Sequence, residues 1–214
     1  MLSEGELLDL YLRNVHWQEL LKPVHGYQQP TTIMDFGFSN VKEMEKARAA
    51  FGEVDFGIER PYFLELGPGK FAVDMSDRLK IGLNKEADPG CNIYWDLNYG
   101  IPLPDETVRR IHSGQVLEHI DNLIYLMNEC WRVLIPGGQM WHGVPYHLGP
   151  HSWGDPTHVR AFTENSFRYF CQSQNGVPFA ESFTDYGIEC SFVLHKQEIK
   201  DGNQGLEVWM NKPE

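Results

Sequence analysis

The sequence is short of basic residues and has no clustered positive charge. Its 214 residues include 18 Lys and Arg against 30 Asp and Glu, which gives a formal net charge of −12 at pH 7. Nucleic-acid backbones and anionic membrane surfaces both attract grouped basic side chains, and Arg109-Arg110 is only a pair. No apolar stretch reaches the length of a transmembrane helix. We therefore expect neither nucleic acid nor a membrane as the main partner.

Cysteine is also scarce, and the four cysteines form no C-x-x-C motif. Wide spacing of this kind favours reduced thiols over a disulfide framework. The first residues are acidic where a secretory signal would be positively charged, and no apolar signal core follows them. These absences predict a cytoplasmic protein. The length allows one full hydrophobic core, and any second domain would have to be small.

The apolar periodicity alternates between strand and helix patterns after residue 60, preceded by helical patterns at 4–21 and 40–51. The pattern predicts strands at 61–66, 81–84, 92–97, within 110–119, and at 139–145, 189–199 and 205–212. It predicts helices at 121–134, capped by Asp121, and at 162–172. Such interleaving indicates an α/β fold with a mostly parallel, doubly wound sheet and a C-terminal antiparallel hairpin. Residues 1–60 would form a helical extension or lid beside a domain at 61–214.

A glycine-containing loop, Gly67-Pro68-Gly69, directly follows the first strand. Glycines allow a ligand to lie against bare backbone, and α/β sheets bind ligands beyond the carboxyl ends of their strands. A simple turn is the alternative, because Gly and Pro punctuate many chains. The dinucleotide pattern G-x-G-x-x-G is not met, since no third glycine follows.

The loop and three later segments together resemble the class I S-adenosylmethionine-dependent methyltransferases. Their acid-x-Gly-x-Gly motif is matched by Glu65–Gly69. The other matching segments follow in the family's order: Trp95-Asp96-Leu97-Asn98, Gln115-Val116-Leu117-Glu118-His119-Ile120 and Trp131-Arg132-Val133-Leu134-Ile135-Pro136-Gly137-Gly138. The segment Gly154–His158 with Phe162-Thr163 resembles a predicted-methyltransferase branch that has a short first crossover. The resemblance covers about residues 61–212 and implies a Rossmann-like fold, with 61–214 as the methyltransferase domain and S-adenosyl-L-methionine as cofactor.

The resemblance also implies roles for individual residues. Gly67 and Gly69 would carry the amino-acid part of the cofactor, with Glu65 facing its ammonium group and Lys70 its carboxylate. Asp96 and Leu97 would flank the adenine, and Gln115 would lie near the methionine portion. The chain departs from the family at the end of the second strand, where Asn84 replaces the usual ribose-binding acid and Glu86 follows two residues later. An amide lacks the charge-assisted strength of a carboxylate.

Histidines gather at the strand predicted at 139–145 and the loop after it, where His142 in the strand and His147, His151 and His158 in the loop accompany Asp155. Histidine and carboxylate together can bind a metal, but the spacing fits no established zinc motif. We predict acceptor binding rather than a metal site. His119, His147 and His158 are candidate general bases, because imidazole titrates near neutrality. Tyr146 and Trp153 could stack on the acceptor or could simply pack.

Two hypotheses from different classes follow. The first is a methyltransferase that acts on an unidentified acceptor, either a small molecule or a protein side chain. The second is a non-catalytic descendant that uses the same fold as a binding or assembly module, which Asn84 motivates. A metal-dependent enzyme built on the histidine-rich loop is a third, weaker reading. The sequence does not identify the acceptor, nor does it predict an oligomeric state.

Overall fold

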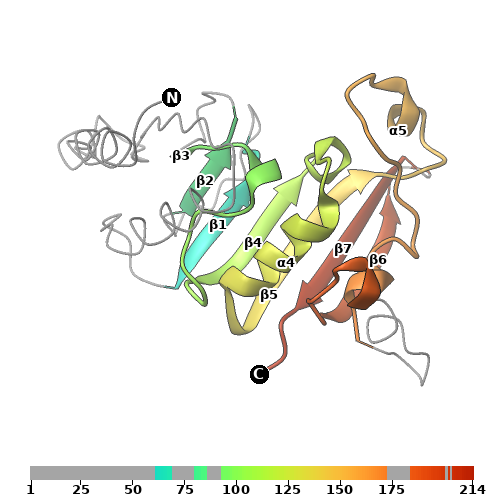
Figure 1. The fold of residues 1–214 in the computed structure, drawn as a ribbon. Coiled ribbons are helices and arrows are strands. Elements are labelled where there is room, and N and C mark those ends of the chain that lie inside the picture. Colours follow the sequence, from blue (N-terminus) through green and yellow to red (C-terminus); the bar gives the residue numbers. More distant parts are fainter. Residues whose placement is uncertain (1–60, 69–79, 86–92, 173–183, 201, 203) are drawn as a thin grey trace.

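The computed structural model describes residues 61–68, 80–85, 93–172, 184–200, 202 and 204–214. These residues form a seven-stranded sheet in the order β3-β2-β1-β4-β5-β7-β6 (Figure 1). The predicted helices at 4–21 and 40–51, and the proposed lid at 1–60, lie outside the described residues. The strands are β1 (Tyr62–Leu66), β2 (Lys80–Asn84), β3 (Ile93–Tyr94), β4 (Val108–Gly114), β5 (Leu134–Pro145), β6 (Val193–Lys200) and β7 (Gly205–Asn211).

The first five strands are parallel, and β7 runs antiparallel to both of its neighbours, β5 and β6. The prediction of a Rossmann-like sheet that ends in an antiparallel hairpin is thereby confirmed. All five residues of β1 are buried, as expected of a central parallel strand covered on both faces. Its last residue, Leu66, pairs with Leu83 of β2 and Ser113 of β4. The carboxyl ends of these three strands therefore lie side by side, at the end of the sheet that we call its carboxyl edge.

Helix α4 (Leu123–Val133) crosses one face of the sheet (Figure 1). Its apolar stripe includes Leu126 and Met127, neither of which is exposed to solvent. Burial of such a stripe provides most of the stability of a helix of this length. The cap differs by one residue from the prediction: Asn122, not Asp121, accepts the hydrogen bond from the Tyr125 amide, at 3.1 Å.

Strand β5 is longer than the predicted 139–145, because the Pro136-Gly137-Gly138 turn lies inside it. Val108 pairs with Leu134, whereas Arg110, two residues further on, pairs with Gln139. The extra residues bulge out of the sheet, with Gly137 in the left-handed region at φ 72°. Its amide donates to the carbonyl of Lys212 at 3.1 Å, so the C-terminal strand holds the bulge.

Two of the predicted strand segments give way to 3₁₀ turns. In the segment predicted at 92–97, β3 ends at Tyr94, because Asp96 accepts from the Asn98 amide at 2.9 Å and starts the 3₁₀ turn η2 (Leu97–Tyr99). Strand β4 ends at Gly114, and a second 3₁₀ turn, η3 (Leu117–His119), follows. Both changes occur at the carboxyl edge, where strands give way to loops.

The helix predicted at 162–172 is wrong. Thr163 and Ser166 hydrogen-bond to each other's backbone and start a series of turns. Short polar side chains often stabilise such turns in place of a helix, because they bond to nearby backbone groups. The series ends in η4 (Arg168–Phe170). Phe192 then pairs with the backbone on either side of Cys171, through Phe170 and Gln172. The buried phenylalanines of this segment thus pack from turns, not from a helix face. A short helix, α5 (Pro150–Gly154), and the turn η6 (Thr184–Tyr186) complete the elements.

Candidate active site

The edge where β1, β2 and β4 end is closed by Gly67, the first glycine of the predicted cofactor loop. Its amide donates to the carbonyl of Leu83 at 2.7 Å, and its φ of +57° lies in the left-handed region. A Cβ at this position would stand 2.5 Å from Cγ2 of Val116. Only glycine fits this conformation without a shift of its neighbours, so the loop after β1 lies directly against the segment after β4. Gly69 and Lys70 lie outside the described residues.

The Glu65 carboxylate is held within the sheet. Lys80 of β2 forms a buried ion pair with it, and Nδ1 of His112 on β4 lies 3.6 Å from its Oε1. Glu65 and Lys80 are each about 3% exposed. Lys80 was not predicted as a partner from the sequence, although a lysine directly before the apolar residues Ile81-Gly82-Leu83 was a usable signal. The predicted contact of Glu65 with the cofactor's ammonium group stays a prediction.

The predicted adenine and ribose residues come together at the ends of β2 and β3. Asn84 accepts at its carbonyl from the Trp95 amide, at 2.8 Å, which places Asp96 beside the end of β2. Asp96 caps the turn in which Leu97 is buried. Gln115, at the end of β4, has a φ of 57°, and its amide donates to the carbonyl of Gly143 at 2.8 Å. Left-handed backbone at a non-glycine residue is uncommon. Glu86 lies outside the described residues.

Glu118, His119 and His158 gather immediately beyond this edge. One possible ligand atom from each lies within 4.8 Å of the others. The two imidazole rings meet edge to face with centroids 4.7 Å apart. The amide of Val159 donates to the carbonyl of Glu118 at 2.9 Å and so fastens the histidine-rich loop to η3. Two of the three candidate bases are thereby brought together; the third, His147, packs against Tyr146 instead.

The Glu118 side chain is buried, with 1% of the residue exposed. Within the described part of the chain, neither of its carboxylate oxygens accepts a hydrogen bond from another residue. Burial raises the pKa of this carboxyl to about 7, although the nearby His158 opposes the change. From the sequence, His119 was predicted as a candidate general base, and Glu118 only as part of a segment that resembles the family. What the sequence lacked was the position of His158 relative to this pair.

Residues 57–142 match the family model described as a methyltransferase domain. This part of the chain is therefore similar to a methyltransferase domain. The sheet order and the antiparallel last strand agree with that assignment. The match supports enzymatic methyl transfer and does not identify the acceptor.

Solved structures share the fold of the methyltransferase domain at low identity. A chain of the complex between the Haloferax volcanii Trm112 methyltransferase activator and the putative methyltransferase is 16% identical, with a TM-score of 0.51, over 81% of this chain and 93% of that one. A putative sarcosine dimethylglycine methyltransferase from Galdieria sulphuraria is 14% identical, with a TM-score of 0.50, over 80% of this chain and 84% of that one. No curated protein matches the sequence. Among the described residues, no helix is long and apolar enough to cross a membrane.

The two aromatic candidates of the methyltransferase domain differ in exposure. Tyr146 is buried, and its hydroxyl hydrogen-bonds to Glu164. Trp153 on α5 is 68% exposed. Tyr146 therefore already uses its polar end within the protein, whereas the Trp153 ring is accessible for stacking. Neither observation tests the predicted contact with an acceptor.

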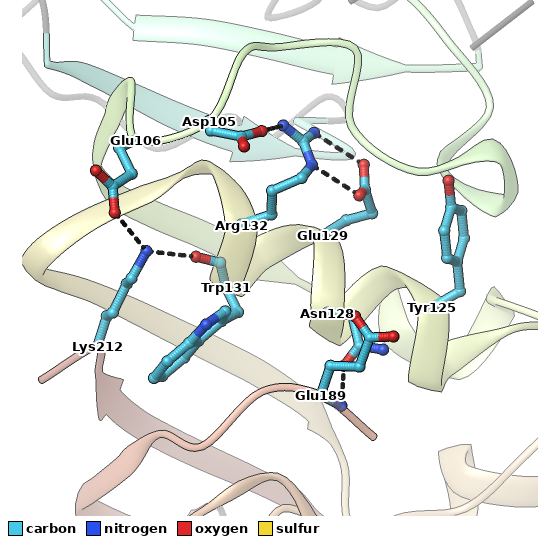
Figure 2. A pocket seen from close by; sticks show the side chains of 9 residues that line it. All are labelled: Asp105, Glu106, Tyr125, Asn128, Glu129, Trp131, Arg132, Glu189 and Lys212. Carbon is cyan, nitrogen blue, oxygen red and sulfur yellow. Dashed lines mark hydrogen bonds and ion pairs between the residues drawn. The ribbon is translucent and has the colours of Figure 1, made fainter. Parts of the chain in front are cut away.

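A groove of about 580 Å³ lies at the opposite edge of the sheet (Figure 2). It is formed by the loop before β4, by α4 and by the end of β7. Figure 2 shows five of its charged side chains paired with one another: Arg132 with Glu129 and Asp105, and Lys212 with Glu106. These pairs hold α4 against neighbouring segments. We assign this groove a structural role, because these charges are paired internally and the groove is remote from the glycine loop.

Proposed function

We propose that the protein transfers the methyl group of S-adenosyl-L-methionine to a small-molecule acceptor bound beyond the ends of β4 and β5. The proposal depends above all on one juxtaposition. Gly67 of the cofactor loop lies against Val116, and two residues later Glu118 begins the cluster with His119 and His158. The cofactor edge and a set of acid–base groups are therefore joined by one short segment.

The cofactor would lie along the edge formed by β1, β2 and β4. Backbone amides of the loop with Gly67 and Gly69 would face its carboxylate, aided by Lys70, and Glu65 would face its ammonium group. Asn84 or Glu86 would bind the ribose, Asp96 and Leu97 the adenine, and Gln115 the methionine portion. The arrangement is supported by the backbone contacts at this edge, where Gly67 bonds to Leu83 and Trp95 bonds to Asn84.

The acceptor would attack the sulfonium methyl group in line, and positioning supplies most of the acceleration in such a reaction. Where the acceptor must lose a proton, His119 or His158 is suited to take it because a neutral imidazole accepts a proton near pH 7. His147 is a third candidate, and Tyr146 and Trp153 are candidate acceptor contacts. The net charge of −12 disfavours nucleic acid as the acceptor. A protein side chain is the competing acceptor.

Calorimetric titration with S-adenosylmethionine and S-adenosylhomocysteine tests this proposal. The wild type should bind both, and Gly69→Trp should abolish binding by filling the cofactor loop. Gly154→Trp is the matched control, because it adds the same bulk at an exposed position where a Cβ has no neighbour within 4 Å. Failure of the folded wild type to bind either compound would overturn the proposal in favour of the non-catalytic module.

A further inference from the structure

We infer that Glu118, His119 and His158 form a binding site for a divalent first-row transition metal such as Zn²⁺. The three side chains present two imidazoles and one carboxylate, with a ligand atom of each within 4.8 Å of the others. Two imidazoles favour zinc and its neighbours over Mg²⁺ and Ca²⁺, which prefer all-oxygen ligand sets. Three protein ligands also leave a coordination position open.

Both histidines are held in the tautomer that a metal site requires. Nδ1 of His158 lies 2.9 Å from the carbonyl oxygen of Ser152, which can only accept, so Nδ1 carries the proton. Thr157 donates its hydroxyl proton to Asp155 at 2.6 Å. The Thr157 oxygen therefore accepts from Nδ1 of His119, 3.0 Å away. In each ring Nε2 keeps its lone pair. Metal-binding histidines are typically oriented in this way, by a hydrogen bond from the other nitrogen.

Among the buried glutamates of the described residues, Glu118 has no Lys or Arg side chain paired with its carboxylate. Three glutamates are buried among the described residues: Glu65, Glu118 and Glu129. Glu65 is paired with Lys80, and Glu129 with Arg132. Glu118 faces histidines, and neither of its oxygens accepts a hydrogen bond from another described residue. A buried carboxylate without a counter-charge is costly, and a bound cation would remove that cost.

The spacing of the three groups is compatible with closure around a metal. Ligand atoms about 2.0–2.1 Å from zinc stand roughly 3.4 Å apart in tetrahedral geometry. The present maximum of 4.8 Å thus requires a movement of about 1.5 Å, which small side-chain rotations supply. Asp155 supports the site from outside, since it accepts from both the amide and the hydroxyl of Thr157.

The position of the metal site suggests that the metal binds the methyl acceptor. This suggestion rests on the proposed function, whereas the metal site itself does not. The cluster follows Val116, which touches Gly67 at the cofactor edge. A metal there would offer its open position to an oxygen or nitrogen of the methyl acceptor. The acceptor class that fits is a small molecule bearing a hydroxyl or carboxylate group that can act as a metal ligand.

Titration of the chelator-treated full chain with ZnCl₂ tests the site without reference to activity. We expect one equivalent to bind, with at least 100-fold weaker binding in Glu118→Gln and His158→Gln. His151→Gln is the matched control, because it removes an exposed histidine of the same loop, and it should bind as the wild type does. Thr157→Val should weaken binding about 10- to 100-fold by releasing His119, and Thr157→Ser should restore it.

The outcomes separate this inference from the proposed function. Absence of saturable Zn²⁺ binding, or equal binding by the wild type and the Glu118 and His158 variants, would overturn the metal site. Thermal unfolding establishes that each variant is folded; should Glu118→Gln not fold, His119→Gln and Thr157→Val give the same decision. S-adenosylmethionine is titrated into the metal-free protein in parallel. Loss of cofactor binding with intact Zn²⁺ binding would remove the proposed function alone.

Discussion

Among single residues, Asn84 is the position where the chain departs from the pattern of the methyltransferases it resembles. It ends β2 beside Asp96, where related methyltransferases usually carry an acid. Under the proposed ribose contact, replacement by aspartate would give a charge-assisted hydrogen bond to a ribose hydroxyl, which is about twice as strong as a neutral one. We expect Asn84→Asp to tighten S-adenosylhomocysteine binding by about 10-fold, or ~1.4 kcal/mol, measured by calorimetry.

Asn84→Ala serves as the companion variant, and it should weaken binding because it removes the amide as well. Unchanged affinity in both variants would mean that the side chain at position 84 does not contact the ribose. Glu86 would then be the residue to replace next.

His142 is a second residue with a measurable consequence. It lies in β5, fully buried and stacked near Phe167, and burial lowers its pKa to about 3. Below the unfolded value near 6.5, the unfolded chain takes up a proton that the folded chain refuses, so stability falls as the pH drops from 6.5 toward 3. His142→Leu should remove this loss, gaining about 2–3 kcal/mol at pH 4.5 relative to pH 8.

Urea unfolding at the two pH values measures the difference. His195→Leu is the control, since His195 is exposed in β6 and its replacement should leave the pH dependence unchanged. An equal acid sensitivity of His142→Leu and the wild type would show that His142 is not the group responsible.

At the scale of elements, the end of β1 depends on the contact between Gly67 and Val116. Gly67→Ala introduces both a left-handed alanine and a Cβ 2.5 Å from Cγ2 of Val116. We expect a loss of about 1–3 kcal/mol. Val116→Ala removes the clash but not the backbone cost, so the double variant should lose less than the sum of the single variants. Denaturant unfolding measures this coupling, and strict additivity would contradict the contact.

Arg132 attaches helix α4 to the loop before β4. Arg132 donates to the carbonyls of Ile101 and Leu103. It also pairs with Glu129 and Asp105 (Figure 2). Lysine keeps the charge but not the planar fork. Arg132→Lys should lower the free energy of unfolding by about 2–4 kcal/mol, measured in urea. Asp105→Asn should cost less than about 1 kcal/mol, because Asp105 is 74% exposed; a reversed order would refute this assignment.

At the scale of the whole molecule, the thiols report on the closed core. Cys130, Cys171 and Cys190 are free and buried, and burial raises the pKa of Cys171 and of Cys190 to about 12. Thiolate is the reactive form, so these groups should not react in the native protein. In Cys91→Ser, we expect negligible labelling by a thiol-reactive chromophore until denaturant unfolds the chain, when three thiols react. Rapid native labelling would show that the core opens locally.

The succession of strands and helices along the chain and the α/β class were predictable, because they depend on local periodicity. The same reasoning was wrong at 162–172, where Thr163 and Ser166 form turns and Phe192 hydrogen-bonds to the backbone on both sides of Cys171. It also placed the Pro136-Gly137-Gly138 turn before β5, whereas the register with β4 and β7 incorporates these residues into the strand. Both differences come from pairing with segments that are distant in the chain, and a local sequence pattern carries no information about such pairing.

The glycine loop after a buried strand and the helix that became α4 could be predicted from the chain alone, since each depends on residues close together in the sequence. The partners of the buried charges could not, because they lie on segments far apart in the chain. Strand register placed Lys80 against Glu65, and the turn after β5 carried His158 to Glu118 and His119. The physical reason is that burial and counter-charge are set by which segments meet in space, and that meeting is a property of the packed sheet.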